Sequence, residues 1–229
     1  ALCDALYAFE PETCEALTPL APGKFDRVGV PGKKWQQTLA FASALPRMST
    51  PLVDWCAGKG HLSRAVQRSQ QQTVHCLEWD ETLVSAGTAL AARHQQNIQY
   101  HHHDVMQPLP AACTGSDKVH IGLHACGELH ISLLKQAVAQ QAQGLALSPC
   151  CYHKIAAEVY QPLSATAAQS ALQFNRQTLH LAVQDTVTAG NSERKLRELE
   201  RWWRLSFDAL QRDLSGCDEY LNVPSCKRA

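Results

Sequence analysis

The 229-residue sequence lacks a hydrophobic run as long as the roughly 20 residues that a membrane-spanning helix needs. A secretory signal peptide, with its basic start and apolar core, is also missing from the beginning of the chain. Charge of one sign is not in excess either, because 21 Lys and Arg balance 21 Asp and Glu. These absences predict no membrane association and no broad phosphate-binding surface, since neutralising phosphates needs clustered cations. A local basic patch is compatible with them.

Cysteine, by contrast, is abundant, with ten residues. A chain of this length buries about 70% of its unfolded surface, so it needs no disulfide staples. Because no secretory signal is visible, we expect reduced thiols and a cytoplasmic protein. The chain has no initiator Met and ends at "PSCKRA" without an obvious final element, so we expect a trimmed sequence.

Short apolar runs alternate with helical patterns from about residue 48. Five of these runs predict strands, at 51–55, 73–79, 98–105, 118–125 and 144–151. The amphipathic segments between them predict helices. This alternation predicts an α/β fold with a mostly parallel sheet and helices on both faces.

Two parts flank this core, which we place at residues 48–154. Residues 1–47 form a lead segment that ends in a predicted helix, "KKWQQTLAFASALP". Its apolar face carries Trp35, Leu39, Ala42 and Leu45. We expect residues 155–229 to be a mostly helical part of the same domain. Within them "SERKLRELERWWRLSFDALQRDL" repeats apolar side chains at helical spacing, and we expect its Trp203 stripe to be core.

The stretch "VDWCAGKGHLS" (53–63) connects a predicted strand to a predicted helix. Ala57, Gly58 and Gly60 let the backbone turn sharply and approach a ligand closely. Asp54 lies at the carboxyl end of the strand, where open α/β sheets bind ligands. A plain tight connection between strand and helix is the alternative interpretation of this motif alone.

Two further acids follow the next two predicted strands. Glu78 ends the second strand, 18 residues after Gly60, near the separation at which a carboxylate accepts hydrogen bonds from ribose hydroxyls. Asp104 ends the third strand, before a proline-containing loop. Three successive strands therefore end in an acid at one edge of one sheet. A nicotinamide oxidoreductase explains Asp54 and Asp104 less well, and the glycine spacing departs from G-x-G-x-x-G.

The motifs "DWCAGKGHLS", "LEWD", "HHDVMQPLP" and "GLHACGEL" resemble those of class I S-adenosylmethionine-dependent methyltransferases, over roughly residues 48–152. The resemblance implies a Rossmann-like fold that binds S-adenosyl-L-methionine. It implies these contacts: Asp54, Ala57, Gly58 and Gly60 for the methionine part, Glu78 for the ribose, and Asp104 and Val105 for the adenine, with His124 beside them. Ala57 departs from the glycine that many members of the family carry.

A narrower set of motifs, "GKGHLS", "GLHACGEL" and "CCYHK", resembles a subgroup that includes RNA methyltransferase-like proteins. Members often carry a lysine-rich stretch before the core, and "VPGKKWQQ" is similar to it. The resemblance implies that Lys33 or Lys34 covers the carboxylate of the cofactor; a solvated helix start is the alternative. It also implies RNA, either tRNA or rRNA, as the substrate class. We expect a local basic patch on "ERKLRELERWWRL" to contact that RNA.

Reactive side chains gather in "HACG" (124–127) and "SPCCYH" (148–153), which we expect to face each other across the acceptor pocket. In the interpretation that we favour, they are walls of this pocket and the tyrosine stacks on a flat substrate. The lining residues would be Cys150, Cys151, Tyr152 and His153.

Three other interpretations of these side chains stay open. A thiolate of Cys126, Cys150 or Cys151 could attack a pyrimidine, with its pKa lowered by His124 or His153. The same cysteines and histidines could bind zinc, or the thiols could simply be buried. We expect no metal here, because adjacent cysteines lack the C-x₂₋₄-C spacing of structural zinc sites. The "HHH" run at 101–103 is expected to be an exposed strand end.

Together these patterns predict an enzyme that transfers a methyl group from S-adenosyl-L-methionine to a nitrogen, oxygen or carbon atom of RNA. Two alternatives are a non-catalytic assembly module with a methyltransferase-like fold and a pyrimidine C5 methyltransferase with a cysteine nucleophile. Nothing in the sequence indicates the oligomeric state.

Overall fold

The computed structural model describes residues 30, 32–184 and 191–217. Its elements are α2 (Gly32–Ala44), β1 (Leu52–Trp55), α3 (His61–Gln70), β2 (Val74–Glu78), α4 (Glu81–Arg93), β3 (Ile98–His102), the 3₁₀-helix η1 (Ala111–Cys113), β4 (Val119–Leu123), α5 (Glu128–Ala139), β5 (Gly144–Ser148), α6 (Ala165–Ala168), α7 (Arg176–Gln184) and α8 (Asn191–Ser215). In these described stretches, no helix combines the length and the apolar character that crossing a bilayer requires.

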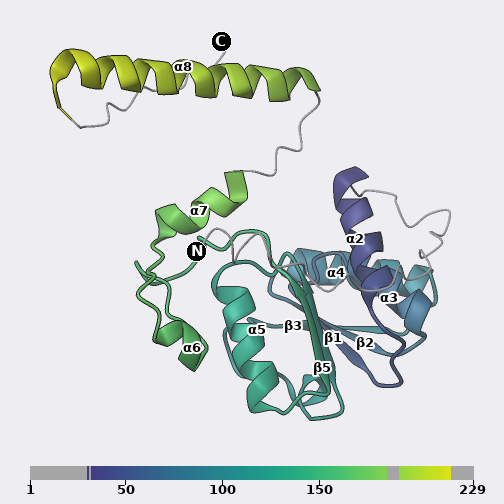
Figure 1. Cartoon of the computed structure of the whole chain (residues 1–229). Helices are drawn as coiled ribbons and strands as arrows, with labels where there is room; N and C mark the ends of the chain where they lie inside the picture. Colours follow the sequence, from purple (N-terminus) through teal and green to yellow (C-terminus); the bar gives the residue numbers. More distant parts are fainter. Residues whose placement is uncertain (1–29, 31, 185–190, 218–229) are drawn as a thin grey trace. The chain divides into compact units, whose positions relative to one another are not determined.

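Five parallel strands form one sheet in the order β3-β2-β1-β4-β5 (Figure 1). The chain runs outward from β1 through β2 to β3, then crosses back and places β4 on the other side of β1. All five carboxyl ends therefore meet at one edge. In open α/β sheets, ligands bind in the crevice where the strand order switches direction. The predicted α/β class with a mostly parallel sheet is confirmed.

Each face of the sheet has its own hydrophobic core, because side chains alternate between the two faces along every strand. Leu52 belongs to the core that contains the buried side chains of α2 and α3. Val53 and Trp55 belong to the other core, with Leu133 of α5 and Cys113 of η1. Helices thus cover both faces, α3 and α4 on one and α5 on the other, as the sequence predicted (Figure 1).

Close packing of α3 and α4 against β3 depends on two glycines. Tyr100 of β3 lies against Gly60 and Gly87, and a Cβ atom at either glycine would collide with the tyrosine hydroxyl or ring. Gly60 therefore permits the close approach of helix and strand, which is one of the uses of glycine in such turns.

Helix α2 differs at one position from the apolar face that the sequence predicted. Trp35, Ala42 and Leu45 are buried, but Leu39 is only half-buried and Thr38 lies in the core instead. The Thr38 hydroxyl donates a 2.9 Å hydrogen bond to the carbonyl of Lys34 one turn earlier. This bond satisfies the hydroxyl within its own helix, so its burial leaves no donor unpaired.

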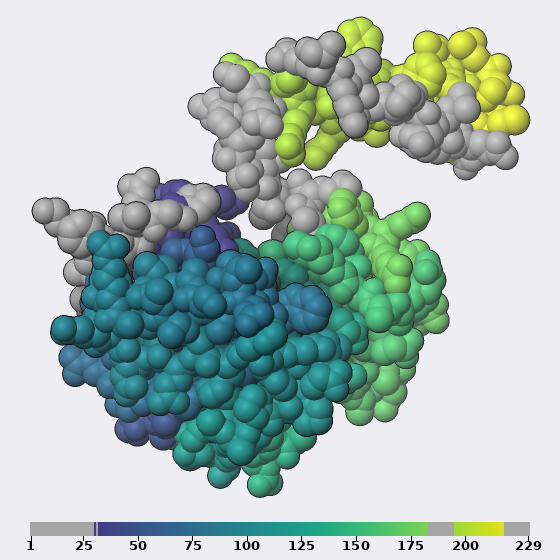
Figure 2. Space-filling view, turned by 180° about the vertical axis from the view of Figure 1, so that it is seen from behind, coloured from purple at the N-terminus to yellow at the C-terminus, as the bar shows by residue number. Residues whose placement is uncertain are grey.

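The chain divides into two compact units after Val183. In the space-filling view the side chains of residues 32–183 form one continuous body (Figure 2). The stretch after β5 contains the short helices α6 and α7. That residues 155–229 belong to one domain with the core stays a prediction.

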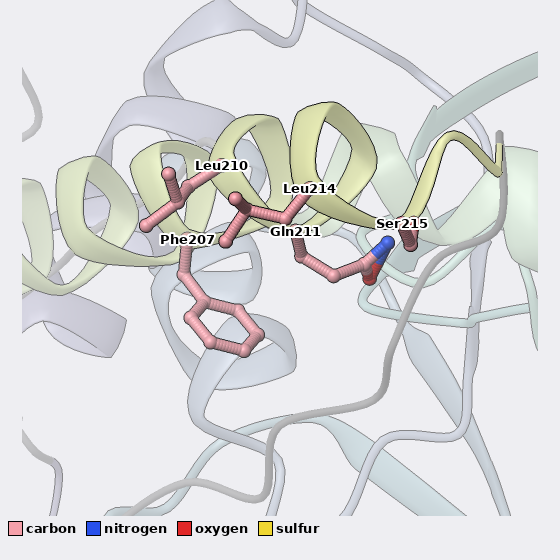
Figure 3. A pocket seen from close by; sticks show the side chains of 5 residues that line it. All are labelled: Phe207, Leu210, Gln211, Leu214 and Ser215. Atoms are coloured by element: carbon pink, nitrogen blue, oxygen red, sulfur yellow. The ribbon is translucent and has the colours of Figure 1, made fainter.

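Helix α8 confirms the long helix that the sequence predicted in the second unit. Within its own unit the apolar stripe of this helix is exposed, with Trp203 61% accessible, and that the stripe is core stays a prediction. Periodicity identifies an apolar face but does not identify what covers it. A groove of about 400 Å³ lies along this helix, and Figure 3 shows its lining side chains, which project from the last turns: Phe207, Leu210, Gln211, Leu214 and Ser215.

Candidate functional site

A cavity of about 360 Å³ lies at the carboxyl ends of β1, β2 and β3. Parallel pairing of the strands brings its lining residues together from distant parts of the chain. They are Cys56, Leu77, Glu78, Trp79, His103, Asp104, Val105 and Leu129. Three of the eight, Glu78, Asp104 and Val105, were predicted from the sequence as cofactor contacts.

The Glu78 carboxylate connects the end of β2 to the glycine turn after β1. Its Oε2 accepts a 2.8 Å hydrogen bond from the backbone N–H of Gly58. Its Oε1 accepts 3.0 Å bonds from the N–H groups of Trp79 and Asp80. A carboxylate has about four lone-pair sites, so one acceptor site is left for a ligand.

The glycine turn leaves open space at Gly58, which does not line the cavity itself but donates its N–H to the lining residue Glu78. The φ of Gly58 is +57°, in the left-handed region, and no atom lies within 4 Å of the position that a Cβ atom would take. The neighbouring Ala57 is half-buried, and its N–H donates to the carbonyl of Leu77 at 3.1 Å. Gly58 therefore offers bare backbone to a ligand, whereas Gly60 contacts Tyr100.

Asp54 lies beneath this turn and is not among the residues that line the cavity. It is 1% exposed, and the Ser63 hydroxyl of α3 donates a short hydrogen bond to its Oδ2. Cys76 in turn donates to the Ser63 Oγ at 2.9 Å. Burial raises the pKa of Asp54 to about 7, against the hydrogen bonds from Ser63, which lower it. The structure thus gives Asp54 a role in anchoring the start of α3.

The loop after β3 is held over the cavity from two sides. Asp104 Oδ1 accepts a 2.9 Å bond from the N–H of Met106. The carbonyl of the buried Val105 accepts bonds of 3.0 Å from Ser132 and 3.1 Å from Gln136, both on α5. Helix α5 therefore positions the two residues that the sequence assigned to adenine.

The chemistry of this cavity fits S-adenosyl-L-methionine. Glu78 and Asp104 present carboxylate acceptors to a ligand with hydroxyl and amino donors. The Nε2 atom of His103 is buried without a hydrogen-bond partner among the described residues, so a polar ligand group would satisfy it. Leu77 and Leu129 add apolar surface.

Helix α2 reaches the same edge of the sheet through its hydrogen bond to His124. Gln37 Oε1 and His124 Nε2 are 3.0 Å apart. Lys34, one turn earlier, is exposed, and its charge adds to burial in lowering the pKa of both His61 and His124. Lys34 therefore lies near both the start of α3 and the loop after β4.

Three thiols meet where the loops after β4 and β5 come together. The Sγ atoms of Cys126 and Cys150 are 2.9 Å apart, and those of Cys150 and Cys151 are 3.5 Å apart. The N–H of Cys150 also donates to Cys126 Sγ at 3.3 Å. The loops "HACG" and "SPCCYH" are therefore in direct contact, and that they line an acceptor pocket stays a prediction.

Hydrogen bonds from its neighbours favour the ionised form of Cys126. Burial alone would raise its pKa, but hydrogen bonds from the side chains and backbone of Cys150 and Cys151 outweigh burial and lower the pKa below its ordinary value of 9.0. Burial, then hydrogen bonding to the other two thiols, raises the pKa of Cys150 to about 12. The sequence attributed a low thiol pKa to a histidine, but here hydrogen bonds from neighbouring cysteines cause it.

The other two predicted pocket residues, Tyr152 and His153, contact different parts of the structure. Tyr152 is 40% exposed, and its ring packs edge-on against His130 with centroids 6.1 Å apart. His153 instead pairs with His180 of α7, with ring centroids 4.5 Å apart. Tyr152 is thus available to a substrate, while His153 is engaged with α7.

Gly127 brings the two acceptor loops into contact. Its φ is +62°, and a Cβ atom there would collide with the carbonyl of Lys154. That carbonyl accepts a 2.9 Å bond from the N–H of Glu128, and Glu128 Oε2 accepts a 3.1 Å bond from the N–H of Ala156. The loop after β5 is therefore fastened to the first turn of α5.

Sequence reasoning missed five lining residues of the cavity: Cys56, Leu77, Trp79, His103 and Leu129. Four of them were detectable, because Cys56, Leu77, Trp79 and His103 are immediate chain neighbours of predicted contacts. Leu129 had no such signal, because only the packing of α5 brings it to the cavity.

The raised pKa of Asp54 predicts an unusual pH dependence of stability. The folded pKa of about 7 exceeds the ordinary 3.8, so the folded state binds more protons than the unfolded state between these values. The free energy of unfolding should therefore fall as pH rises through this window, by up to about 4 kcal/mol. In Asp54→Asn the amide oxygen still accepts the hydrogen bond from Ser63, but the side chain does not ionise. The fall in the free energy of unfolding with rising pH should therefore disappear in this variant.

Urea unfolding of wild type and Asp54→Asn at pH 5 and pH 8 measures the difference. The control is Asp117→Asn, because the pKa of this exposed carboxyl is lowered by its hydrogen bond to Lys118 and so titrates below the window. A wild-type protein that gains stability relative to Asp54→Asn as pH rises would contradict the prediction.

Comparison with known proteins gives the family. The family model described as a methyltransferase domain matches residues 35–158, more than half of the chain. Among solved structures, the YcgJ protein of Bacillus subtilis is 17% identical, with a TM-score of 0.39 over 47% of this chain and 46% of that one. The MccD protein is 14% identical, with a TM-score of 0.41 over 52% and 53%.

A third similar structure, a Pyrococcus abyssi tRNA (uracil-54, C5)-methyltransferase in complex with S-adenosyl-L-homocysteine, is 12% identical, with a TM-score of 0.40 over 50% of this chain and 28% of that one. This chain thus spans about half the length, or less, of the solved proteins that it matches. The assignment rests on the family match, because TM-scores this low add nothing to it. The chain belongs to the methyltransferase domain family, which confirms the predicted class of enzyme and its cofactor, S-adenosyl-L-methionine.

Proposed function

We propose that this chain transfers the methyl group of S-adenosyl-L-methionine to RNA. The bound cofactor supplies an electrophilic methyl group on a sulfonium, so the chain's own task is to bind, orient and exclude water. The acceptor would enter between the loops 124–127 and 148–153, where Tyr152 is exposed beside the three thiols.

Each part of the cofactor has a candidate partner at the cavity. The free acceptor site of Glu78 would take a hydrogen bond from ribose, and Asp104, with the backbone of Val105, would hold the adenine. The open backbone at Gly58 would approach the methionine part, and Lys34 would pair with its carboxylate. Ala57 and His124 border these positions. Asp54 and Gly60 would act as positioning residues, through Ser63 and Tyr100.

Cations beside the acceptor loops are the observation that carries RNA as the substrate class. Lys33, Lys34 and Lys59 are exposed. Lys34 and Lys59 lower the pKa of His61 after burial does, and Lys34 and Lys33 do the same for His124, so all three lie near this edge. Lysines in such a group attract phosphates, and an exposed tyrosine can stack on an unpaired base.

The basic residues of helix α8 are weaker candidates for an RNA contact than the sequence suggested. Arg204 forms an ion pair with Glu200 at 3.0 Å, and Arg212 forms one with Asp208 at 2.9 Å. These pairs offset part of the positive charge of the helix. The lysines at the mouth of the site are therefore the better candidates for phosphate contacts.

A pyrimidine C5 methyltransferase is the second candidate, and the lowered pKa of Cys126 favours it. In that reaction the Cys126 thiolate adds to C6 of the base, and the electron pair reaches C5, which takes the methyl group. A base then removes the C5 proton, and the C–S bond breaks to restore the ring and the thiolate. A non-catalytic assembly module would need none of the three acids at the sheet edge.

Cofactor binding is tested by titration with S-adenosylhomocysteine. Gly58→Ala should weaken binding more than about 10-fold, or 1.4 kcal/mol, because the added methyl group projects into the open space at the turn. Gly216→Ala is a matched control, since Gly216 also has a left-handed φ, +66°, and open space around it, but belongs to the other compact unit. Unchanged affinity in Gly58→Ala would place the cofactor elsewhere.

RNA as the substrate is tested with labelled S-adenosylmethionine and RNA from cells that lack the gene. The double variant Lys33→Ala/Lys59→Ala should bind this RNA more weakly and lower the salt slope of the affinity by roughly 1.4, at about 0.7 per lost phosphate contact on single strands. Lys135→Ala, on the exposed side of α5, should change neither quantity. Absence of label in RNA, with retained cofactor binding, would exclude RNA as the acceptor.

The role of the thiols is tested with RNA that carries a 5-fluoropyrimidine. If the thiols are pocket walls, Cys126→Ser, Cys150→Ser and Cys151→Ser should each keep turnover, and mass spectrometry should find no protein–RNA adduct. Tyr152→Ala should lose more, through about 1–3 kcal/mol of base stacking. A covalent adduct on Cys126 would instead establish the C5 mechanism.

A further inference from the structure

Two histidines and a cysteine form a second cluster of metal-ligating side chains, separate from the acceptor loops. His75 lies on β2, His101 on β3 and Cys113 at the end of η1. His75 Nδ1 and His101 Nε2 are 3.1 Å apart. One ligand atom from each of the three residues lies within 4.8 Å of the other two.

The parallel sheet produces this convergence. β2 and β3 are neighbours at one edge of the sheet, and His101 pairs in register with Leu77, two residues beyond His75. Residues in register share a face, as do residues two apart, so both histidines lie on the Leu77 face. Cys113 packs in the same core as Leu77 and so approaches that face from above.

Burial makes this cluster unusual for polar groups. His75 is 7% exposed, Cys113 is fully buried, and His101 is half-buried. The two imidazoles pair with each other through His75 Nδ1 and His101 Nε2, which offsets part of the cost of burying such polar groups. We propose that His75, His101 and Cys113 bind a divalent transition metal ion, with Zn²⁺ as the preferred ion.

The distances suit such an ion. Tetrahedral zinc with Zn–N bonds of about 2.0–2.1 Å separates two nitrogen ligands by about 3.3 Å, close to the 3.1 Å between the imidazole atoms. In such a site a nitrogen and a sulfur ligand would lie about 3.6 Å apart. The ligand atoms of the three residues here lie within 4.8 Å of one another, so small side-chain rotations would bring them to that distance. Imidazole and thiolate favour zinc or copper over Mg²⁺ and Ca²⁺, which prefer oxygen.

The two histidines have the protonation state that metal binding needs, whereas the Cys113 thiol must first lose its proton. Burial first, and neighbouring positive charge second, lowers the pKa of both histidines, so their imidazoles are neutral and can donate lone pairs. Burial raises the pKa of Cys113 to about 11, and the charge of Lys118 opposes this rise. Binding would therefore displace the thiol proton into solvent and form a metal–thiolate bond. Asp117 holds Lys118 at 2.8 Å.

Three protein ligands leave a fourth position for water, and the half-exposed side of His101 is the natural access to it. The ion would attach η1 to β2 and β3. The chain between His101 and Cys113 carries Asp104 and Val105 of the cavity, so the metal would stabilise the same loop that α5 holds. This site is independent of the proposed methyl acceptor.

The experiment uses the full chain loaded with Co²⁺ or Zn²⁺ after chelator treatment. Wild type should bind one ion per chain and show the near-ultraviolet charge-transfer band of a cobalt–thiolate bond. His101→Ala should weaken Co²⁺ binding by more than about 100-fold, since even groups that only support ligands change affinity 10–100-fold. Cys113→Ala should abolish the charge-transfer band. Zn²⁺ should raise the melting temperature of wild type but not of His101→Ala.

The control is the triple variant Cys126→Ser/Cys150→Ser/Cys151→Ser, because these thiols are also close enough to hold an ion. This variant should keep the band and the stoichiometry. Loss of binding in the triple variant, or no difference between wild type and His101→Ala, would overturn the proposal. His101 is only half-buried on an edge strand, so its variant decides the question even where Cys113→Ala does not fold.

Discussion

The hydrogen bonds of the Glu78 carboxylate hold the functional edge of this domain together. They join the N–H of the glycine turn after β1 to two N–H groups at the start of the loop after β2. A buried carboxylate that accepts several N–H bonds is strongly stabilised, and it fixes the donors in turn. The cavity walls on either side of Glu78 depend on this arrangement, since Cys56 precedes the turn and Trp79 follows the acid.

Burial and hydrogen-bond donors together set the ionisation of the groups around this carboxylate in opposite directions. Asp54 lies below it in a dry core, where the raised pKa keeps much of its charge off at neutral pH. Cys126 lies beyond it in the acceptor loops, where donors from two other cysteines favour the thiolate. The same edge therefore combines an acid whose ionisation is disfavoured, Asp54, with a thiol whose ionisation is favoured, Cys126. This difference follows from the number of hydrogen-bond donors that each group meets, because burial alone would raise both pKa values.

The acceptor side owes its shape to backbone contacts. Gly127 permits the loop after β4 to touch the carbonyl of Lys154, and Glu128 fastens the loop after β5 to α5. This clamp places Cys126 against Cys150 and leaves Tyr152 accessible. The cavity and the thiols are close enough for the charge of Cys126 to raise the pKa of Cys56, after burial, Glu78 and Asp54. A methyl donor and its acceptor could therefore meet at this edge.

The sequence by itself determined the α/β class and the parallel sheet, because the alternation of strands and helices is a local pattern. From the acids at strand ends it also predicted the edge at which a ligand would bind. It also named Gly58, Glu78 and Asp104. Only the tertiary structure decided that Asp54 faces Ser63 rather than the cavity, that Gly60 serves Tyr100, that Thr38 replaces Leu39 in the core, and that His75, His101 and Cys113 meet. These outcomes depend on which side chains from distant segments lie opposite each other, and periodicity carries no information about the partner across a sheet or a helix interface.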